Sequence, residues 1–360
     1  MRRFHALKVR SVTPDADDAV AIALEVPAQL AAEYRGIPGQ HVVLRASLGG
    51  AELRRTYSLV SAPGESVLRI VPRVHAHGQL SRHLAEEVRA GDALEVLPPN
   101  GSFTARGPVA GGSYVAFAAG CGITPVLAIV RALLEGGAAR VLVFYGNTGA
   151  GRAMCLEELL SLKDRYLGRL ALHFVMSREP QEVALYNGRL DAPRVRELAR
   201  TLFAASEVRE YFVCGPGDMI EQVSRTLREL GVPGARIHSE HFTLASTEAA
   251  PAPAARETAA PAQPAGGAAE VTVLIDGRRR SFSMRAEDET VLEGAARAGI
   301  ELPFSCRAGV CSTCRTKVIR GAVRMAQNYA LEDWELEQGY VLACQAHVTA
   351  APLELDYDEK

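Results

Sequence analysis

Four cysteines near the carboxyl end of the 360-residue chain have a spacing that suits metal chemistry. Four residues separate Cys306 from Cys311, two separate Cys311 from Cys314, and 29 separate Cys314 from Cys344. Thiolates are soft ligands that suit zinc, copper(I) or an iron–sulfur cluster. The first three would lie on one tight loop, SCRAGVCSTC, in which Gly309 permits a positive φ angle. Such a loop can direct backbone N–H groups toward the sulfur atoms, and the distant fourth cysteine would close the site.

The spacing of these cysteines distinguishes between the alternative metal sites. Structural zinc sites more often use two short pairs with two intervening residues each. Four and then two intervening residues, with a remote fourth cysteine, are the arrangement of plant-type 2Fe–2S sites. The spacing therefore predicts a 2Fe–2S cluster. The alternative, which belongs to a different class of function, is a zinc site in a non-catalytic scaffold protein.

The chain holds seven cysteines in all, and its start, MRRFHALKVRSV, has no apolar run of the kind found in secretory signals. We therefore expect a cytoplasmic protein with thiol or metal chemistry rather than a disulfide framework.

Two upstream motifs have the residue types that hold a flavin. The first ends a predicted strand and consists of Arg55, Thr56, Tyr57 and Ser58. Its arginine can pair with a pyrophosphate, its tyrosine can stack on the flavin ring, and its serine can hydrogen-bond near the flavin N5 atom. The second opens a predicted helix and consists of Gly78, Gln79, Leu80 and Ser81. The first N–H groups and the dipole of a helix favour a phosphate. Val71 and Arg73, between the motifs, complete the expected flavin-binding set.

Taken alone, each motif also fits an ordinary structural role. The first is compatible with any exposed strand that carries a core tyrosine, and the second with a common helix cap. Because both motifs occur together upstream of the cysteine loop, they indicate a flavin site more strongly than either does alone.

Two turns between predicted strands and helices suit a dinucleotide. The sequence GCGITP lets the backbone approach a ligand closely and contains Gly120, Gly122, Thr124 and Pro125. The second turn, CGPGDM, contributes Cys214, Gly215, Pro216 and Met219. Both turns would lie at the carboxyl edge of a parallel sheet, where open α/β folds bind ligands. Ser177 and Arg178 end another strand at that edge and could hold a 2′-phosphate, which favours NADPH over NADH.

The elements that would position these residues fall into two patterns. Apolar runs at 19–26, 40–46, 53–60 and 67–74, with one helix at 79–89, predict an antiparallel β-barrel. After residue 112, strands at 114–118, 141–145, 170–176 and 211–214 alternate with helical segments at 125–135, 155–166, 193–201 and 217–230. This alternation predicts an α/β domain with a parallel sheet.

The last part of the chain has its own signals. Residues 245–269 are rich in Ala and Pro and have no larger apolar side chain, which predicts a linker. Asp276-Gly277 predicts a hairpin turn, and Thr290 with Glu293 predicts a capping box. We expect domains at 1–108 (FAD-binding barrel), 109–244 (NAD(P)H-binding α/β domain) and 270–360 (an α+β β-grasp ferredoxin domain), with the linker between the last two.

The net charge of the chain argues against some classes of binding partner. The formal net charge is −2, so no strong field favours nucleic acid or a membrane surface. Residues 1–247 have a net charge of +3 and residues 270–360 one of −4, so the tail suits a basic partner. The uncharged stretch 109–130 is long enough to span a membrane, but its glycines and proline break it into a strand, a turn and a helix.

Together, RTYS, GCGITP and CGPGDM resemble motifs of the ferredoxin–NADP reductase superfamily, with a plant-type ferredoxin fused at the carboxyl end. The segment Glu240-His241-Phe242 resembles the family's terminal segment against the flavin. The resemblance implies bound FAD, with FMN as the alternative, and a nicotinamide between the Gly120–Pro125 turn and Cys214. It implies that Ser58, Cys214 and Glu240 polarise or position the reacting atoms, while Phe242 covers the flavin.

Within that superfamily, PGQHVVLR, NYALEDWELEQGYVLACQA and LDYDE resemble the reductase subunits of phenylacetyl-CoA epoxidases. That resemblance implies electron transfer from NADPH through FAD and the 2Fe–2S cluster to the di-iron oxygenase subunits of a multicomponent complex. The alternatives keep the chemistry and change the acceptor to another di-iron or Rieske oxygenase, or to a hybrid-cluster protein.

Overall fold

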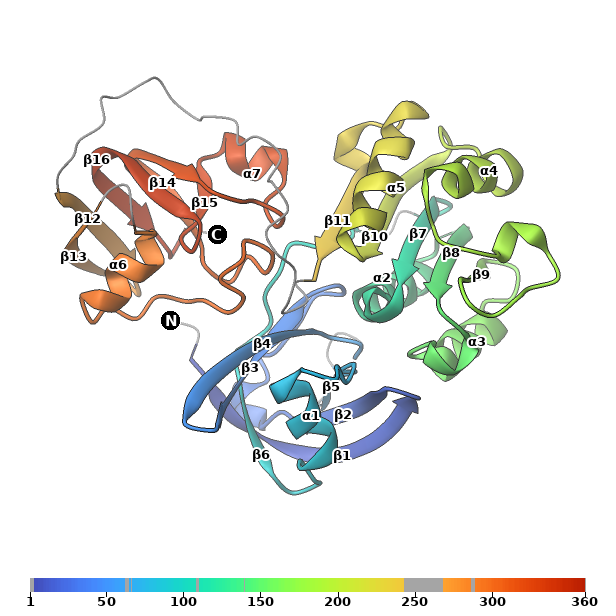
Figure 1. Cartoon of the computed structure of the whole chain (residues 1–360), viewed down its shortest axis with the longest axis horizontal. Helices are drawn as coiled ribbons and strands as arrows, with labels where there is room; N and C mark the ends of the chain where they lie inside the picture. Colours follow the sequence, from blue (N-terminus) through green and yellow to red (C-terminus); the bar gives the residue numbers. More distant parts are fainter. Residues whose placement is uncertain are drawn as a thin grey trace. The chain divides into compact units, whose positions relative to one another are not determined.

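The computed structural model describes residues 3–61, 65, 67–107, 110–138, 140–242, 268–285 and 289–359. Two compact units make up the chain: residues 4–242 form one, and the carboxyl-terminal part forms the other. Figure 1 shows two sheets in the first unit and one in the second. The predicted linker lies outside the described residues except for Ala268 and Ala269, which are the first two residues of a strand.

A six-stranded antiparallel sheet begins the first unit. Its strands are β1 (His5–Ala16), β2 (Ala19–Glu25), β3 (His41–Leu48), β4 (Ala51–Ser58), β5 (Val67–Ile70) and β6 (Ala93–Val96). They run in the order β4-β3-β6-β1-β2-β5, and an antiparallel bridge between Leu59 and Ile70 joins the two edges into the predicted barrel. Alternate residues such as Ile22 and Leu24 fill the interior, and helix α1 (Gln79–Glu86) packs Leu80 and Leu84 into the same core.

A five-stranded parallel sheet completes this unit. Its strands are β7 (Ser113–Ala119), β8 (Arg140–Asn147), β9 (Leu170–Met176), β10 (Val208–Gly215) and β11 (Ile237–His241). The order β11-β10-β7-β8-β9 places β7, the first strand in sequence, at the centre. The helices are α2 (Ile123–Glu135), α3 (Leu156–Arg165), α4 (Ala192–Leu202) and α5 (Gly217–Glu229). Short 3₁₀ turns occur at Ala28–Leu30, Gly120–Gly122, Ala150–Arg152, Ala184–Tyr186 and Gly234–Arg236.

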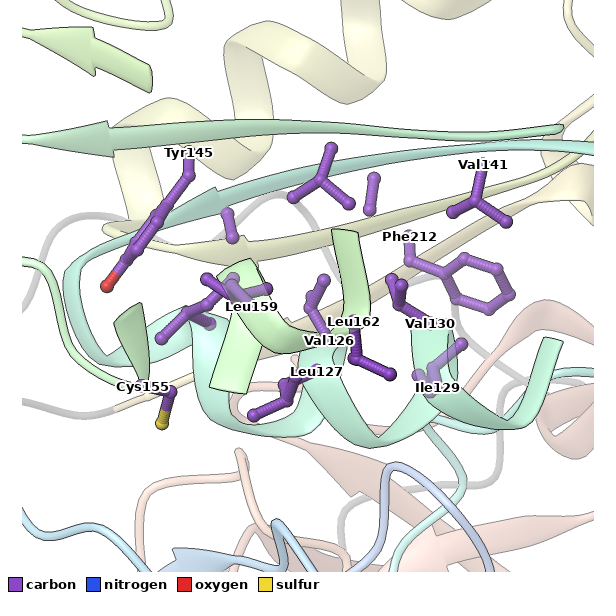
Figure 2. Close-up of a cluster of buried hydrophobic side chains, with 14 of the residues drawn as sticks. Val126, Leu127, Ile129, Val130, Val141, Tyr145, Cys155, Leu159, Leu162 and Phe212 are labelled. Atoms are coloured by element: carbon purple, nitrogen blue, oxygen red, sulfur yellow. The ribbon is translucent and has the colours of Figure 1, made fainter. Parts of the chain in front are cut away.

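Two hydrophobic cores cover the faces of this sheet. Tyr114 and Ala116 of β7 point to the core formed by α2 and α3, whereas Val115 and Phe117 point to the core formed by α4 and α5. Figure 2 shows the first core, in which Val126, Leu127 and Val130 of α2 and Leu159 and Leu162 of α3 face the strands. Because β7 is buried on both faces, its sequence reads as a continuous apolar run.

The second unit is a mixed sheet with two short helices. Its strands are β12 (Ala268–Ile275), β13 (Arg278–Arg285), β14 (Arg315–Met325), β15 (Tyr340–Leu342) and β16 (Ala346–Asp356), in the order β13-β12-β16-β14-β15. The helices are α6 (Val291–Arg297) and α7 (Asp333–Glu337). The predicted hairpin is confirmed by positive φ angles of 53° at Asp276 and 69° at Gly277. The predicted capping box of Thr290 and Glu293 is also present.

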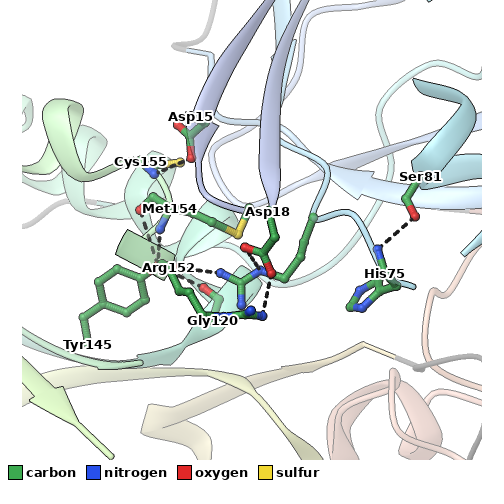
Figure 3. A network of polar contacts seen from close by, with 10 residues as sticks. Asp15, Asp18, His75, Ser81, Gly120, Tyr145, Arg152, Met154 and Cys155 are labelled. Carbon is green, nitrogen blue, oxygen red and sulfur yellow. Dashed lines mark hydrogen bonds and ion pairs between the residues drawn. The ribbon is translucent and has the colours of Figure 1, made fainter. Parts of the chain in front are cut away.

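Carboxylates at the β1–β2 turn join the barrel to the parallel-sheet domain. The Asp15 carboxylate accepts the N–H of Cys155 at 3.0 Å, and Asp18 contacts the guanidinium groups of Arg73 and Arg152 (Figure 3). Nearby, the Glu158 carboxylate of α3 lies between two guanidinium groups. It pairs with Arg69 of β5 and, at 2.7 Å, with Arg131 of α2. Burial lowers the pKa of Arg131, whose side chain also donates to the Val60 carbonyl of the barrel.

None of the described helices is long and apolar enough to cross a membrane. The stretch at 109–130 divides instead into β7 and the first part of α2, as its glycines and proline predicted.

Replacing Glu158 by alanine removes the carboxylate that Arg69 and Arg131 share. Exposed ion pairs contribute at most about 1 kcal/mol, whereas breaking a buried pair costs about 3–5 kcal/mol. Glu158 is half-buried, so we expect the free energy of unfolding to fall by about 1–3 kcal/mol. Glu157→Ala removes the same charge from an exposed neighbour on α3 and should cost less than about 0.5 kcal/mol. Denaturant unfolding measures both, and equal losses would contradict this role.

Candidate active site and cluster site

The barrel presents two predicted flavin motifs on neighbouring elements. Ser58 ends β4 and is 4% exposed, and its hydroxyl has no hydrogen-bond partner among the described residues. A buried hydroxyl of this kind needs a partner, so it suits a bound group that offers one. Tyr57 is half-buried against the barrel core, and Arg55 is exposed. An exposed guanidinium beside a half-buried aromatic ring has the chemistry of a site for a pyrophosphate and a ring system.

The second motif forms the start of α1. Gly78 precedes the helix, and no side chain caps its first N–H groups, which leaves them for a phosphate. The Ser81 hydroxyl accepts the His75 N–H at 3.3 Å and donates to the Gly78 carbonyl at 3.2 Å. A Cβ atom at Gly78 would overlap the Ser81 hydroxyl, so a larger residue here would displace that hydroxyl from its two hydrogen bonds. Gln79 is exposed, whereas the side chain of Leu80 is buried in the core.

Val71 and Arg73 lie between these motifs. The side chain of Val71 is buried in the core, so only its backbone can face a cofactor. The Arg73 guanidinium donates to the Arg152 carbonyl at 2.6 Å and lies against Gly120, which links the barrel to the edge of the parallel sheet. Thr56 completes the predicted set as a half-buried residue of β4.

The two predicted nucleotide turns meet at the carboxyl edge of β7 and β10. Gly120 has a φ angle of 56°, and its carbonyl accepts the Tyr145 hydroxyl at 3.1 Å (Figure 3). A Cβ atom at Gly122 would overlap the Cys214 carbonyl, so the two backbones touch. The two turns that were expected to flank a nicotinamide therefore lie side by side, and the position of the nicotinamide itself stays a prediction.

The rest of both turns is packed tightly around this contact. The Thr124 hydroxyl donates to the Cys121 carbonyl at 2.9 Å, and Pro125 is buried in the first turn of α2. At the other turn, a Cβ atom at Gly215 would meet Met219 at 2.7 Å, while Pro216 is exposed ahead of α5. Small residues therefore keep both helix starts close to the sheet edge.

Burial raises the pKa of the Cys214 thiol, and the nearby Glu240 and Cys121 raise it further. The side chain is fully buried. Cys214 therefore remains a neutral thiol at neutral pH, which suits packing and weak hydrogen bonding rather than nucleophilic attack.

Ser177 and Arg178 are exposed after β9, at the same edge of the sheet. Their N–H groups donate to the carbonyls of Asn147 and Thr148 at 2.9 and 3.0 Å, which ties the end of β9 to the end of β8. The Asn147 amide and the Thr148 hydroxyl are buried and have no hydrogen-bond partner in the described part of the chain. No sequence motif points to these two residues, because one Asn-Thr pair in a loop carries no distinctive spacing.

The strand β11 brings the predicted terminal segment to this place. Glu240 is opposite Cys214 in the parallel register and is 9% exposed, and Phe242 packs against the core shared by α2 and the barrel. One residue that the sequence analysis did not select lies here as well. The Nδ1 atom of His41 is 3.6 Å from the Glu240 carboxylate.

The four predicted ligand cysteines lie together in the second unit. Cys311, Cys314 and Cys344 are at most 5% exposed, and Cys306 is half-buried. Hydrogen bonds from the thiols of Cys311 and Cys344 lower the pKa of Cys306, and the N–H of Ala308 donates to its sulfur at 3.3 Å. Hydrogen bonding to Cys306 raises the pKa of Cys311, and hydrogen bonding to Cys306 and Cys314 raises that of Cys344.

These contacts form a chain, in which Cys311 adjoins Cys306, Cys306 adjoins Cys344, and Cys344 adjoins Cys314. No group of three or more His, Cys, Asp or Glu side chains in the described residues has the geometry to hold a single metal ion. Four neighbouring thiols supply the number and type of ligands that the two irons of a 2Fe–2S cluster require. The donor set therefore fits the predicted cluster.

The backbone of the cluster loop and one buried hydroxyl also fit this cluster. Gly309 has a φ angle of 74°, as predicted, and Arg307 and Ser312 have positive φ angles without being glycines. Such strain persists where the surrounding structure enforces it, often at functional sites. The Tyr357 hydroxyl is buried without a hydrogen-bond partner among the described residues. Burial raises its pKa, and the nearby thiols of Cys314 and Cys344 raise it further.

Replacing Cys344 by alanine should remove the cluster, because one pair of ligands is then incomplete. We expect the purified variant to lose iron, acid-labile sulfide and cluster absorbance while it keeps its flavin. Cys121→Ser removes a thiol outside the cluster loop and serves as the control with full iron content. Stoichiometric zinc without iron in the unaltered chain would contradict the cluster assignment.

Comparisons with known proteins agree with this arrangement. Residues 8–105 match the oxidoreductase FAD-binding domain family, residues 117–225 the oxidoreductase NAD-binding domain family, and residues 273–349 the 2Fe-2S iron-sulfur cluster binding domain family. These matches identify the flavin as FAD rather than FMN. They also identify the sulfur-ligated centre as a 2Fe–2S cluster rather than zinc.

Relatives match over the full length. The chain is 39% identical to one of the subunits of 1,2-phenylacetyl-CoA epoxidase of Escherichia coli (strain K12), across 100% of this chain and 99% of that one. It is 31% identical to the ferredoxin reductase component of 3-ketosteroid-9-alpha-monooxygenase of Rhodococcus rhodochrous, across 98% and 96%. The solved structure of phthalate dioxygenase reductase, 23% identical, superposes with a TM-score of 0.59 over 98% of each chain and shares the fold.

The sheets, the thiol pairs and these matches lead to one assignment. The chain belongs to the ferredoxin–NADP reductase superfamily with a carboxyl-terminal 2Fe–2S domain, and it is an NAD(P)H-dependent electron-transfer reductase.

Proposed function

We propose that this reductase supplies electrons from NADPH to the di-iron oxygenase subunits of a phenylacetyl-CoA epoxidase, in the cytoplasm. The observation that carries the proposal is 39% identity over the full chain to one component of that enzyme in Escherichia coli (strain K12). Reductase components of other oxygenases match most of this chain at 31% identity or less. They support an oxygenase as the partner in general, and a Rieske or another di-iron oxygenase, or a hybrid-cluster protein, is the alternative acceptor.

When bound, FAD takes up a hydride from the nicotinamide, and the cluster carries its electrons onward one at a time. The chain's own residues would bind and orient these groups. Arg55, with Tyr57, would hold the flavin on the barrel, and the uncapped start of α1 at Gly78 would bind its phosphates. Ser58 would offer its free hydroxyl to the reacting edge of the ring.

The nicotinamide would lie along the shared edge of the Gly122 and Cys214 turns. The neutral Cys214 thiol and the Glu240 carboxylate, side by side on β10 and β11, would position it. Phe242 follows β11 and would cover the flavin until the nicotinamide displaces it. At the far end of the cofactor, Ser177 and Arg178 are exposed and would bind a 2′-phosphate, which supports NADPH over NADH.

Reconstitution with purified oxygenase subunits tests the acceptor. We expect NADPH to reduce first the flavin and then the cluster in an anaerobic titration. We then expect NADPH-dependent oxygenation of phenylacetyl-CoA when the di-iron subunits are added. A matched reaction with a Rieske oxygenase should turn over far more slowly. Equal or faster turnover there would move the assignment to that class, and a protein that NADPH does not bleach would contradict the reductase pathway itself.

Gly122→Ala should separate the two touching turns. A displacement of about 1 Å at a reacting centre can cost about 100-fold in rate, so we expect flavin reduction by NADPH to slow by about that factor. Gly168→Ala adds the same methyl group in open space on this domain and should leave the rate unchanged. Stopped-flow flavin absorbance measures both, and a normal rate in Gly122→Ala would show that the contact is dispensable.

A further inference from the structure

The side chain of His41 is the most deeply buried titratable group at the edge of the barrel that the proposed function does not use. His41 opens β3 and is 1% exposed. Its backbone pairs with Asn100, but neither ring nitrogen has a hydrogen-bond partner within the described residues. Leaving buried polar groups unpaired costs about 1–3 kcal/mol each. We therefore expect the His41 imidazole to form a hydrogen bond with a group that lies close by.

Two strand registers bring four polar side chains to the same place. In the barrel, His41 is directly opposite Ser58. In the parallel sheet, Cys214 is directly opposite Glu240. Paired residues on adjacent strands have neighbouring side chains. The 3.6 Å approach of His41 Nδ1 to the Glu240 carboxylate joins the two pairs across the boundary between barrel and sheet.

The Glu240 carboxylate needs such a neighbour. It is 9% exposed, and its second oxygen is buried without a hydrogen-bond partner in the described structure. Burying a carboxylate without hydrogen bonds or a countercharge is strongly unfavourable. The His41 ring is close enough to donate a hydrogen bond to this carboxylate after a small rotation, and hydrogen bonds to a charged acceptor are short and directional.

We infer that His41 is a positioning residue that holds the Glu240 carboxylate against Ser58 and Cys214, where the hydride is transferred. This inference rests on the proposed roles of Ser58, Cys214 and Glu240. His41 touches neither substrate nor cofactor in this account and acts through Glu240. The barrel thereby fixes a side chain that belongs to the other domain, which keeps the flavin-binding and nicotinamide-binding halves of the site in register.

The test compares three variants of the full-length, flavin-loaded protein. His41→Leu removes the ring nitrogens, and we expect flavin reduction by NADPH to slow by about 10- to 100-fold, with the Kd for NADPH changed less than about twofold. His41→Asn keeps a donor near the Nδ1 position and should recover most of the rate. In a Glu240→Gln background, His41→Leu should add little further loss, since residues that act through one another are not additive.

His238→Leu is the matched control. His238 lies on the same strand as Glu240, is 3% exposed, and its ring is also 3.6 Å from a carboxylate, that of Glu210. The two variants should lose similar stability, but the control should keep the rate of flavin reduction. Equal slowing in His41→Leu and His238→Leu, or full additivity with Glu240→Gln, would overturn the inference.

A second readout does not depend on turnover. In the oxidised, flavin-loaded protein, we expect a slowly exchanging Nδ1–H resonance of His41 in ¹⁵N-histidine NMR spectra that disappears in Glu240→Ala and persists in Glu210→Ala. Loss of the resonance in both variants, or in neither, would contradict the contact even where His41→Leu fails to fold. A wild-type protein that shows the resonance but is not reduced by NADPH would instead refute the proposed function and leave the contact established.

Discussion

No side chain fits between Gly122 and the carbonyl of Cys214, and this contact determines the geometry of the nucleotide edge. The two turns leave neighbouring parallel strands, so α2 and α5 start at the same end of the sheet, on its opposite faces. The N–H groups at helix starts favour negatively charged ligands. Tyr145 also stabilises the Gly120 turn, because its hydroxyl donates to the Gly120 carbonyl and accepts the N–H of Met154.

The barrel depends on that edge through a small number of charged contacts. Three of them come from the β1–β2 turn and from Arg73, whose guanidinium lies between Gly120 and Asp18. Glu158 adds a fourth by holding arginines of both domains. Because the barrel closes at the Leu59–Ile70 bridge, Ser58 lies beside its seam and is buried rather than exposed to solvent. Contacts between domains thus set where the flavin motif meets the nucleotide turns.

The second unit has a different requirement, which is to bury four sulfur atoms that become negatively charged on metal binding. Its loop takes up left-handed backbone at three positions, one of them Gly309. The side-chain amide of Gln345 ties that loop to the end of β15 by donating to the Arg307 carbonyl at 3.0 Å. Cys344 therefore reaches the thiols of Cys306 and Cys314 although it is remote in sequence. The four sulfur atoms lie close together in the folded chain itself, so folding does most of the ordering that the cluster requires.

The sequence alone was enough to predict the cluster, because the spacing of its ligands is characteristic. Three thiolates come from one loop and the fourth from the turn between β15 and β16, and the cysteine intervals specified the cluster. The alternation of short apolar strands with helices predicted the parallel sheet, and β9 was predicted to the residue. Local rules also predicted the Asp276-Gly277 turn and the Thr290 capping box, because both depend on residues adjacent in the chain. The strands β1 and β6 were not predicted, because β1 carries exposed charged residues and a bulge, and β6 has four residues.

Only the tertiary structure determines which residues that are distant in the sequence lie close together. His41, Ser58, Cys214 and Glu240 come from four strands of two sheets, and no spacing in the chain relates them. Their proximity follows from strand register and from the packing of barrel against sheet, both of which are long-range properties. For the same reason no spacing in the sequence shows that the backbones at Gly122 and Cys214 touch. Local patterns specify which groups a chain can offer, and only the packing of its sheets decides which of them share one site.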